Sequence, residues 1–185
     1  MGATKSSLKG KRILAVDDEV DILETIEDIL DEAEVDRATD YDSASAKIRR
    51  GGYDLAILDI MGVNGLKLLE EAVDRGIPAV MLTAHAINPE TLMASIRKGA
   101  ISYLPKETLA ELDTLLEKLL GAHEAGKPAW QLLFDRLGSY FDERFGPDWK
   151  EKDREFWSEF SRTYQISKGI ASRLSKDPRF RDKGY

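Results

Sequence analysis

The stretch Arg12-Ile13-Leu14-Ala15-Val16-Asp17-Asp18 joins a short apolar run to two adjacent carboxylates. Such a run is typical of a strand buried on both faces, as in a parallel sheet. The pattern recurs in Leu55-Ala56-Ile57-Leu58-Asp59 and in Ala79-Val80-Met81-Leu82-Thr83. These three stretches predict strands of one parallel sheet, each ending in a polar side chain.

Helical patterns separate these strands along the chain. Helices are predicted for Ile22–Leu30, Ser43–Arg50, Leu66–Val73, Pro89–Lys98 and Leu109–Leu120, with weaker strands at Glu34–Ala38 and Ile101–Leu104. Asn88 is a plausible N-cap for the helix that begins at Pro89. Alternating strands and helices require parallel strands joined by right-handed crossovers. The sequence therefore predicts an α/β fold with a five-stranded, doubly wound parallel sheet, followed by an α-helical extension.

Polar residues gather where the predicted strands end. Ligands of open α/β sheets bind at the carboxyl ends of the strands, where this sequence places Asp17, Asp18, Asp59, Thr83 and Lys106. Three carboxylates in one cleft repel each other, and Mg²⁺ relieves that repulsion while leaving room for a phosphate. A hydroxyl and an ammonium suit the oxygens of a transferring phosphoryl group. A carboxylate can act as the nucleophile and give an aspartyl phosphate.

At these positions the sequence resembles the receiver domain of two-component response regulators, which has a flavodoxin-like fold. The resemblance covers roughly residues 10 to 120 and rests on the motifs Ile13-Leu14-Ala15-Val16-Asp17-Asp18-Glu19, Leu58-Asp59-Ile60-Met61, Leu82-Thr83-Ala84 and Tyr103-Leu104-Pro105-Lys106. Each motif alone is weak, whereas the five positions together, each at a strand end, are specific.

The resemblance implies a role for each matching acid. Asp59 would be the phosphoacceptor. Asp18 and Asp59 would bind Mg²⁺ through their side chains, Met61 would add its backbone carbonyl, and Asp17 would act through water.

The resemblance also implies a switch and a partner. Thr83 and Lys106 would hold the phosphoryl oxygens, and Tyr103 would swing inward as Thr83 moves. The phosphodonor would be a phosphohistidine on a sensor histidine kinase or phosphotransfer protein, or a small molecule. The signal would be a population shift in the surface built from the fourth helix, fifth strand and fifth helix. The protein would then be a switch, not a conventional enzyme.

Three departures from the family pattern bear on this interpretation. The loop from Asp59 to Gly65 is shortened, which affects how Met61 presents its carbonyl. Glu107 stands where the family usually has a proline, and a cis bond there would cost about 3 kcal/mol, so we expect a rearranged loop or a strained bond. His85 occupies a position that tunes hydrolysis in this family, although an exposed loop residue is the plainer interpretation. A pseudo-receiver with little phosphotransfer remains an alternative.

Charge and aromatic content divide the chain into two parts. The net charge is −7, and residues 1–120 carry 14 Lys+Arg against 23 Asp+Glu, while the remainder carries 13 against 11. All 6 Phe and all 3 Trp lie between Trp130 and Phe180. We expect a flexible leader (1–10), a receiver domain (11–120), a linker (121–128) and a helical, aromatic-rich extension (129–185).

The extension leaves its output open. Its aromatic residues recur at helical spacing up to Phe141, Gly146-Pro147 breaks the pattern, and Asp148 is a candidate cap for a second helix. Such an apolar segment must bury against the receiver, a second copy in a homodimer, or a partner protein. The basic stretch Ser161–Tyr185 makes DNA binding the main competing output. A phosphate-transferring hydrolase is the last alternative, because the sequence shows neither a segment to cover an active site nor a substrate pocket.

Composition limits the remaining classes. The chain of 185 residues has no cysteine, which excludes disulfides and thiolate metal sites. With 2 histidines, a zinc site made mainly of imidazoles is not expected. No apolar run approaches the length of a membrane span. We expect a cytoplasmic protein that does not bind membranes.

Overall fold

The computed structural model describes residues 7–84, 87–127 and 129–160. The chain divides into two compact units, Met1–Arg136 (the first unit) and Leu137–Tyr185 (the second unit). Helix α6 (Ala129–Phe145) begins in the first unit and ends in the second. This division lies beyond the segment 121–128 that the sequence suggested as a linker.

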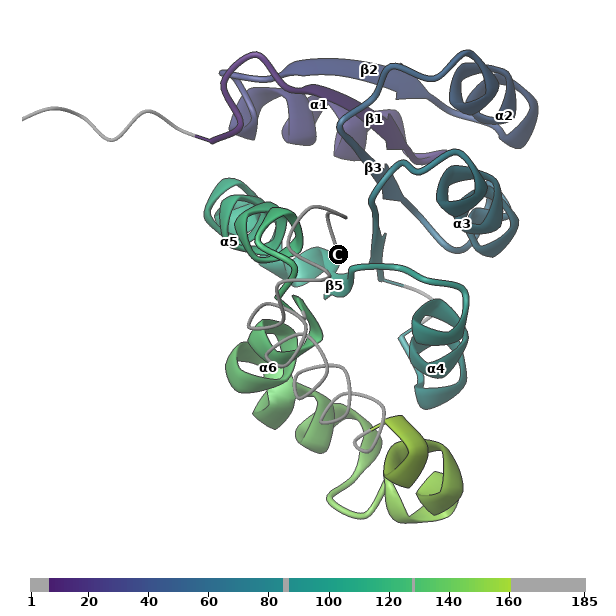
Figure 1. Ribbon diagram of the computed structural model, residues 1–185, viewed down its shortest axis with the longest axis vertical. Coiled ribbons are helices and arrows are strands. Elements are labelled where there is room, and N and C mark those ends of the chain that lie inside the picture. Colours follow the sequence, from purple (N-terminus) through teal and green to yellow (C-terminus); the bar gives the residue numbers. More distant parts are fainter. Residues whose placement is uncertain (1–6, 85–86, 128, 161–185) are drawn as a thin grey trace, which may run out of the picture. The chain divides into compact units, whose positions relative to one another are not determined.

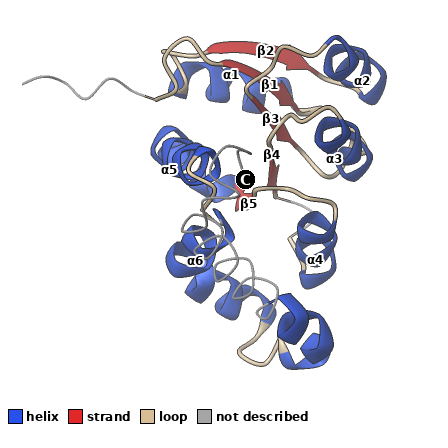
Figure 2. Cartoon of the chain, viewed as in Figure 1, coloured by secondary structure: helices blue, strands red, loops and turns tan. Residues whose placement is uncertain are grey.

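The first unit is built on one parallel sheet of five strands in the order β2-β1-β3-β4-β5 (Figure 2). The strands are β1 (Arg12–Val16), β2 (Glu34–Ala38), β3 (Leu55–Leu58), β4 (Ala79–Thr83) and β5 (Ser102–Pro105). Strand β1 from Ile13 onward and all of β3 and β4 are buried and almost entirely apolar, because helices cover both faces of the sheet. The predicted fold class is confirmed.

Helices cover both faces of this sheet (Figure 1). They are α1 (Val20–Ile29), α2 (Tyr41–Arg50), α3 (Gly65–Asp74), α4 (Pro89–Arg97) and α5 (Leu112–Glu124). Helices α1 and α5 pack together on one face, and α2, α3 and α4 lie side by side on the other. The doubly wound arrangement places every β-to-α loop at the carboxyl edge of the sheet.

Local capping explains where two of these helices begin. The Asp40 side chain accepts a hydrogen bond from the Ser43 amide at 2.7 Å and caps α2. Asn88 accepts from the Thr91 amide at 2.8 Å, with Pro89 in the first turn of α4. Both caps satisfy backbone donors that the helix leaves unpaired. The cap predicted at Asn88 is confirmed.

The chain after β5 differs from the predicted helix over Leu109–Leu120. A 3-10 helix, η1 (Lys106–Glu111), follows the strand directly, and α5 begins only at Leu112. Apart from the buried Lys106 side chain, the residues of η1 are partly or fully exposed, so the leucine pattern anchors the helix only from Leu112 onward. Helix α5 then continues to Glu124, into the expected linker 121–128, because packing along its leucine face outweighs the cost of Gly121 within the helix.

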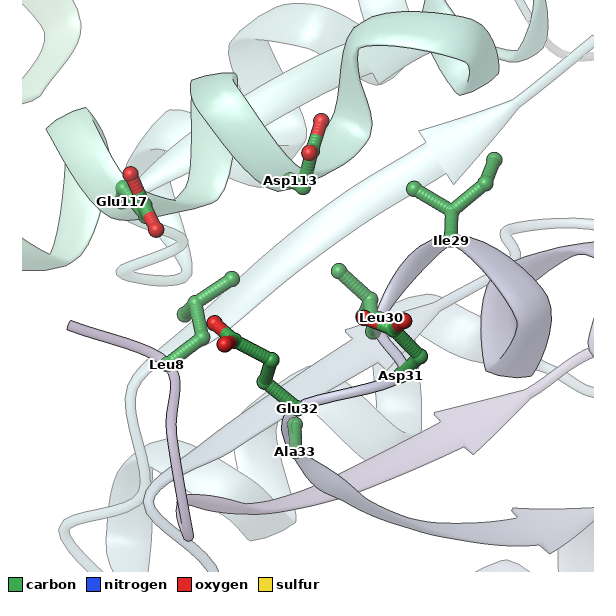
Figure 3. A pocket seen from close by; sticks show the side chains of 8 residues that line it. All are labelled: Leu8, Ile29, Leu30, Asp31, Glu32, Ala33, Asp113 and Glu117. Carbon is green, nitrogen blue, oxygen red and sulfur yellow. The ribbon is translucent and has the colours of Figure 1, made fainter. Parts of the chain in front are cut away.

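The amino edge of the sheet holds a small pocket of about 100 Å³ (Figure 3). Its lining comes from the end of α1, the turn before β2, helix α5 and Leu8. Within the expected flexible leader, Leu8 is buried and the Gly10 amide donates to the Glu32 carbonyl at 2.9 Å. The pocket lies at the edge opposite the predicted functional residues, since α-to-β turns meet the amino ends of the strands.

The second unit is an aromatic cluster. Phe141 is fully buried, stacks on Phe145 at 5.6 Å between ring centroids, and meets Trp149 edge-on. Trp149 also contacts Trp157 at 5.1 Å and donates its indole N–H to Asp142 at 2.8 Å. These contacts bury the large apolar rings that the sequence left unassigned.

The helix that we expected to begin at Asp148 is displaced. Helix α6 ends at Phe145, Gly146 takes a φ of +92°, and a turn leads into the 3-10 helix η2 (Glu151–Asp153). Within the described part of the chain, residues 154–160 are then helical. Because Trp149 is buried, the chain forms a turn here instead of a regular helix. Across the ranges that the structure describes, no helix has both the length and the apolarity to cross a bilayer.

Candidate functional site

The strand register brings the predicted residues together at the carboxyl edge of the sheet. Val16 pairs with Leu58, so Asp17 and Asp59 follow at neighbouring positions. The Asp59 amide also donates to the Val16 carbonyl at 2.9 Å. On the next strand pair, Thr83 is opposite Pro105, which directly precedes Lys106.

Lys106 joins the acids of this edge. Its ammonium lies 2.8 Å from Asp17 Oδ2 and 3.6 Å from Asp59 Oδ2. All three side chains are buried, and Thr83 is fully buried as well. A buried ammonium between two carboxylates needs such partners, because an unpaired charge in the interior is strongly destabilising.

Burial dominates the protonation of these groups. Burial raises the pKa of the Asp59 carboxyl to about 6, and the negative charge of Asp17 adds to that rise. The pKa of Asp17 is also raised, chiefly by burial, although its hydrogen bond with Lys106 opposes the change. Burial by itself lowers the pKa of Lys106, but the hydrogen bonds with Asp17 and Glu19 and the charge of Asp59 leave it raised overall. The cluster therefore carries excess negative charge that a cation would relieve.

An acidic rim, in which Asp17 is buried and Asp18 and Glu19 are exposed, adjoins the buried cluster. The carboxylates of Asp17, Asp18 and Glu19 offer oxygens that all lie within 4.8 Å of one another. Glu19 also accepts from Lys106 at 3.1 Å. Glu19 is the site residue that our reading of the sequence missed, although the uninterrupted run of three acids was visible there.

The short loop after Asp59 lies close against both acids. A Cβ atom on Gly65 would lie 1.7 Å from the Asp59 carbonyl oxygen, so only glycine fits there. A Cβ on Gly62 would lie 2.4 Å from Asp18 Oδ2. The turn closes with Asn64 at a φ of +53° and the Gly65 amide donating to the Ile60 carbonyl at 3.1 Å. Met61, which precedes Gly62 in this turn, exposes its side chain.

The remaining predicted residues have different outcomes. Tyr103 is fully buried, and its hydroxyl pairs with Thr91 Oγ1 of α4 at 2.9 Å. His85 lies outside the described residues, so its predicted role stays a prediction. At Glu107 the chain turns into η1, and the described residues contain no cis peptide bond. The expected rearrangement after Lys106 is therefore this 3-10 helix.

The donor chemistry of the site fits a hard divalent cation. Carboxylate oxygens from Asp17 and Asp18 border the buried carboxyl of Asp59, and the loop carrying the Met61 carbonyl lies against Asp18. Oxygen-only donor sets of this kind suit Mg²⁺, which keeps several waters and shares its coordination with phosphate. A buried lysine at the same edge suits an anionic group beside the cation.

The model of the response regulator receiver domain matches residues 13–119. The chain belongs to this family. The matched range contains four of the strands, β1 from Ile13 onward and every predicted site residue, whereas α6 and the second unit lie outside it.

Relatives and solved structures support the same assignment. The chain is 34% identical over 122 residues to the phosphate regulon transcriptional regulatory protein PhoB of Klebsiella pneumoniae, covering 59% of this chain and 53% of that protein. It is 31% identical over 118 residues to the DNA-binding response regulator MtrA of Mycolicibacterium paratuberculosis, covering 58% and 52%. The chain thus spans about half the length of these two relatives.

Among solved structures, a receiver domain protein from Methanospirillum hungatei aligns with a TM-score of 0.58 at 30% identity, covering 64% of this chain and 99% of that one. NtrX from Brucella abortus aligns with a TM-score of 0.56 at 34% identity, covering 67% of this chain and 29% of that one. Both alignments leave about a third of this chain unmatched.

Proposed function

We propose that this receiver is a phosphorylation-controlled switch in which Asp59 accepts a phosphoryl group. The observation that carries the proposal is Lys106, a buried ammonium held 2.8 Å from Asp17 and 3.6 Å from Asp59 at the carboxyl edge of the sheet. An isolated ion pair needs one acid, whereas this lysine sits among three. The surplus of acids is suited to a site that also takes a cation and a phosphate.

The chain's own residues have distinct parts in the transfer. An oxygen of the ionised Asp59 carboxylate attacks phosphorus of the donor, forming a P–O bond while the P–N bond of a phosphohistidine breaks and the imidazole keeps the electron pair. Lys106 orients a phosphoryl oxygen, and the Thr83 hydroxyl donates to another. Bound Mg²⁺, held by Asp18, Asp59 and the Met61 carbonyl with Asp17 through water, would supply the charge neutralisation that this transfer needs.

The partners follow from the family. Receivers of response regulators interact with histidine kinases, so we propose a sensor kinase or phosphotransfer protein as donor and a cytoplasmic location. No separate substrate is turned over, because the phosphoryl group stays on the receiver until water removes it. Output through protein contacts or a homodimer involving the extension is our first hypothesis.

DNA binding is the second candidate output. Two relatives, PhoB and MtrA, are named as transcriptional or DNA-binding regulators. The basic stretch Ser161–Tyr185 that suggested DNA binding lies outside the described residues. Binding to duplex DNA that weakens steeply with salt would favour this output over protein contacts.

Acetyl phosphate with Mg²⁺, followed by intact mass, tests the phosphoacceptor. We expect a gain of one phosphoryl group in the wild type and none in Asp59→Asn. Asp74→Asn, on the exposed end of α3, is the matched control and should gain the group normally. Equal modification of wild type and Asp59→Asn would overturn the proposal, and no modification of either would favour a pseudo-receiver.

A further inference from the structure

The three acids at the carboxyl edge of the sheet are held in different ways. Asp17 pairs with Lys106 at 2.8 Å and accepts from the Glu19 amide at 2.9 Å. Asp59 is buried and faces Lys106 at 3.6 Å. Asp18 is exposed, and within the described ranges its carboxylate has neither a hydrogen bond nor an ion pair. Carboxylates that bind metals are usually oriented by hydrogen bonds, so a ligand role for Asp18 needs a different constraint.

The loop between β3 and α3 supplies this constraint through its backbone. Gly62 has a φ of +82°, which residues with a side chain rarely adopt. A Cβ atom added there would lie 2.4 Å from Asp18 Oδ2, 2.6 Å from its Cγ and 2.9 Å from its Oδ1. These distances place the Gly62 backbone directly against the carboxylate group. Packing on Gly62, rather than a hydrogen bond, therefore limits where the Asp18 carboxylate can lie.

The loop is anchored on both sides of Gly62. Ile60 and Val63 are buried, and the Gly65 amide donates to the Ile60 carbonyl at 3.1 Å. By contrast, the atoms that Gly62 contacts are the outer end of an exposed side chain. A methyl group added at Gly62 should therefore displace the Asp18 carboxylate and leave the loop in place.

We propose that Gly62 is a positioning residue that fixes the Asp18 carboxylate for a bound cation. The inference rests on the proposed function, in which the side chains of Asp18 and Asp59 and the Met61 carbonyl hold Mg²⁺. Met61 directly precedes Gly62, so the short loop that carries one proposed ligand also packs on another. The contact thereby sets the separation between these two ligands.

The size of the cation distinguishes this role from a general effect on the fold. Mg²⁺ requires near-ideal octahedral geometry with short distances to oxygen, whereas Ca²⁺ accepts longer distances and variable geometry. A displaced Asp18 carboxylate should therefore weaken the binding of Mg²⁺ more than that of Ca²⁺. A loss of stability alone would weaken the binding of both cations alike.

Gly62→Ala tests the inference, with Gly76→Ala as the matched control. Gly76 has a similar φ of +71°, so both changes strain the backbone, but a Cβ atom at Gly76 has nothing within 4 Å. In EDTA, both variants should fold and lose similar amounts of stability to urea. In calorimetric titrations, Gly62→Ala should bind Mg²⁺ about tenfold more weakly and Ca²⁺ less than about threefold more weakly. Gly76→Ala should bind both cations as the wild type does.

The possible results separate this inference from the proposed function. Wild-type affinity for Mg²⁺ in Gly62→Ala would overturn the inference, and so would equal losses of affinity for Mg²⁺ and Ca²⁺. Unfolding of Gly62→Ala under conditions where Gly76→Ala is folded would also overturn it, because the Asp18 side chain would then not yield to the methyl group. If the wild type binds no Mg²⁺, the cation site of the proposed function is wrong, and this inference with it.

Discussion

Asp59 is buried beside Asp17 although its proposed role requires it to be charged. Burial and the neighbouring carboxylate raise its pKa to about 6 from an ordinary value of 3.8. Compared with a carboxyl in water, Asp59 in the folded protein is shifted toward the neutral acid, while nucleophilic attack needs the carboxylate. Without a cation, ionised Asp59 lowers the stability of the fold. A cation bound at this site would relieve the unfavourable burial and repulsion of that negative charge.

This unfavourable burial and repulsion predict that Asp59→Asn stabilises the protein without divalent cations. A group with a raised folded pKa contributes stability that is complete below its unfolded pKa, near 3.8, and is lost as the pH rises through about 6. At pH 7.5 in EDTA, the variant should therefore unfold in urea with a free energy larger by roughly 1–3 kcal/mol. Near pH 4 the difference should largely disappear. A variant less stable than the wild type at pH 7.5 would contradict the raised pKa.

Glu19 belongs to the acidic rim and accepts from Lys106 at 3.1 Å with a half-exposed side chain. Glu19→Gln removes one negative charge near the proposed cation and should weaken Mg²⁺ binding by about three- to tenfold. Because water reaches the Glu19 side of this pair, the pair contributes only about 0–1 kcal/mol to stability, so the urea midpoint should barely move. Calorimetric titration checks the affinity. Glu24→Gln on the exposed face of α1 is the control, and an equal loss there would mean a general charge effect.

At the scale of elements, the loop between β3 and α3 is the tightest connection of the site. Gly65→Ala would place a Cβ atom 1.7 Å from the Asp59 carbonyl. The loop must then move, and we expect a loss of about 2–4 kcal/mol in the free energy of unfolding, together with slower phosphorylation. In Gly121→Ala, an open position inside α5, the same change should stabilise by roughly 0.5–1 kcal/mol. Urea denaturation compares the two variants, and equal effects would contradict the steric argument.

Sequence periodicity predicted the elements that face a core and missed those that tertiary contacts decide. Strand β2 matches its predicted range, and the cap at Asn88 was visible from residue types. The 3-10 helix after Lys106 was not predicted, because leucine spacing cannot distinguish a tight turn from the first turn of a helix. Glu19 was missed because the run of acids does not reveal that Lys106 turns toward it.

At the scale of the whole molecule, the boundary that composition suggests differs from the boundary between the two compact units. Aromatic content changes after residue 120, yet the compact first unit extends to Arg136. Composition reports which residues need burial but not which surface buries them. Residues 129–136 at the beginning of α6 therefore belong to the first unit, although their composition resembles that of the extension.

Because the chain forms two compact units, we predict that the aromatic cluster can be weakened without loss of the receiver site. Phe141 is fully buried against Phe145 and Trp149, and Phe141→Ala should lower the stability of the second unit by about 3–5 kcal/mol. The fluorescence of Trp149 and Trp157, read in a Trp130→Phe background, should then be lost at lower urea. Acetyl phosphate should still modify Asp59, because every residue of the proposed site lies before Glu107. Loss of phosphorylation in folded Phe141→Ala would show that the second unit is required for the site, and that the two units act as one.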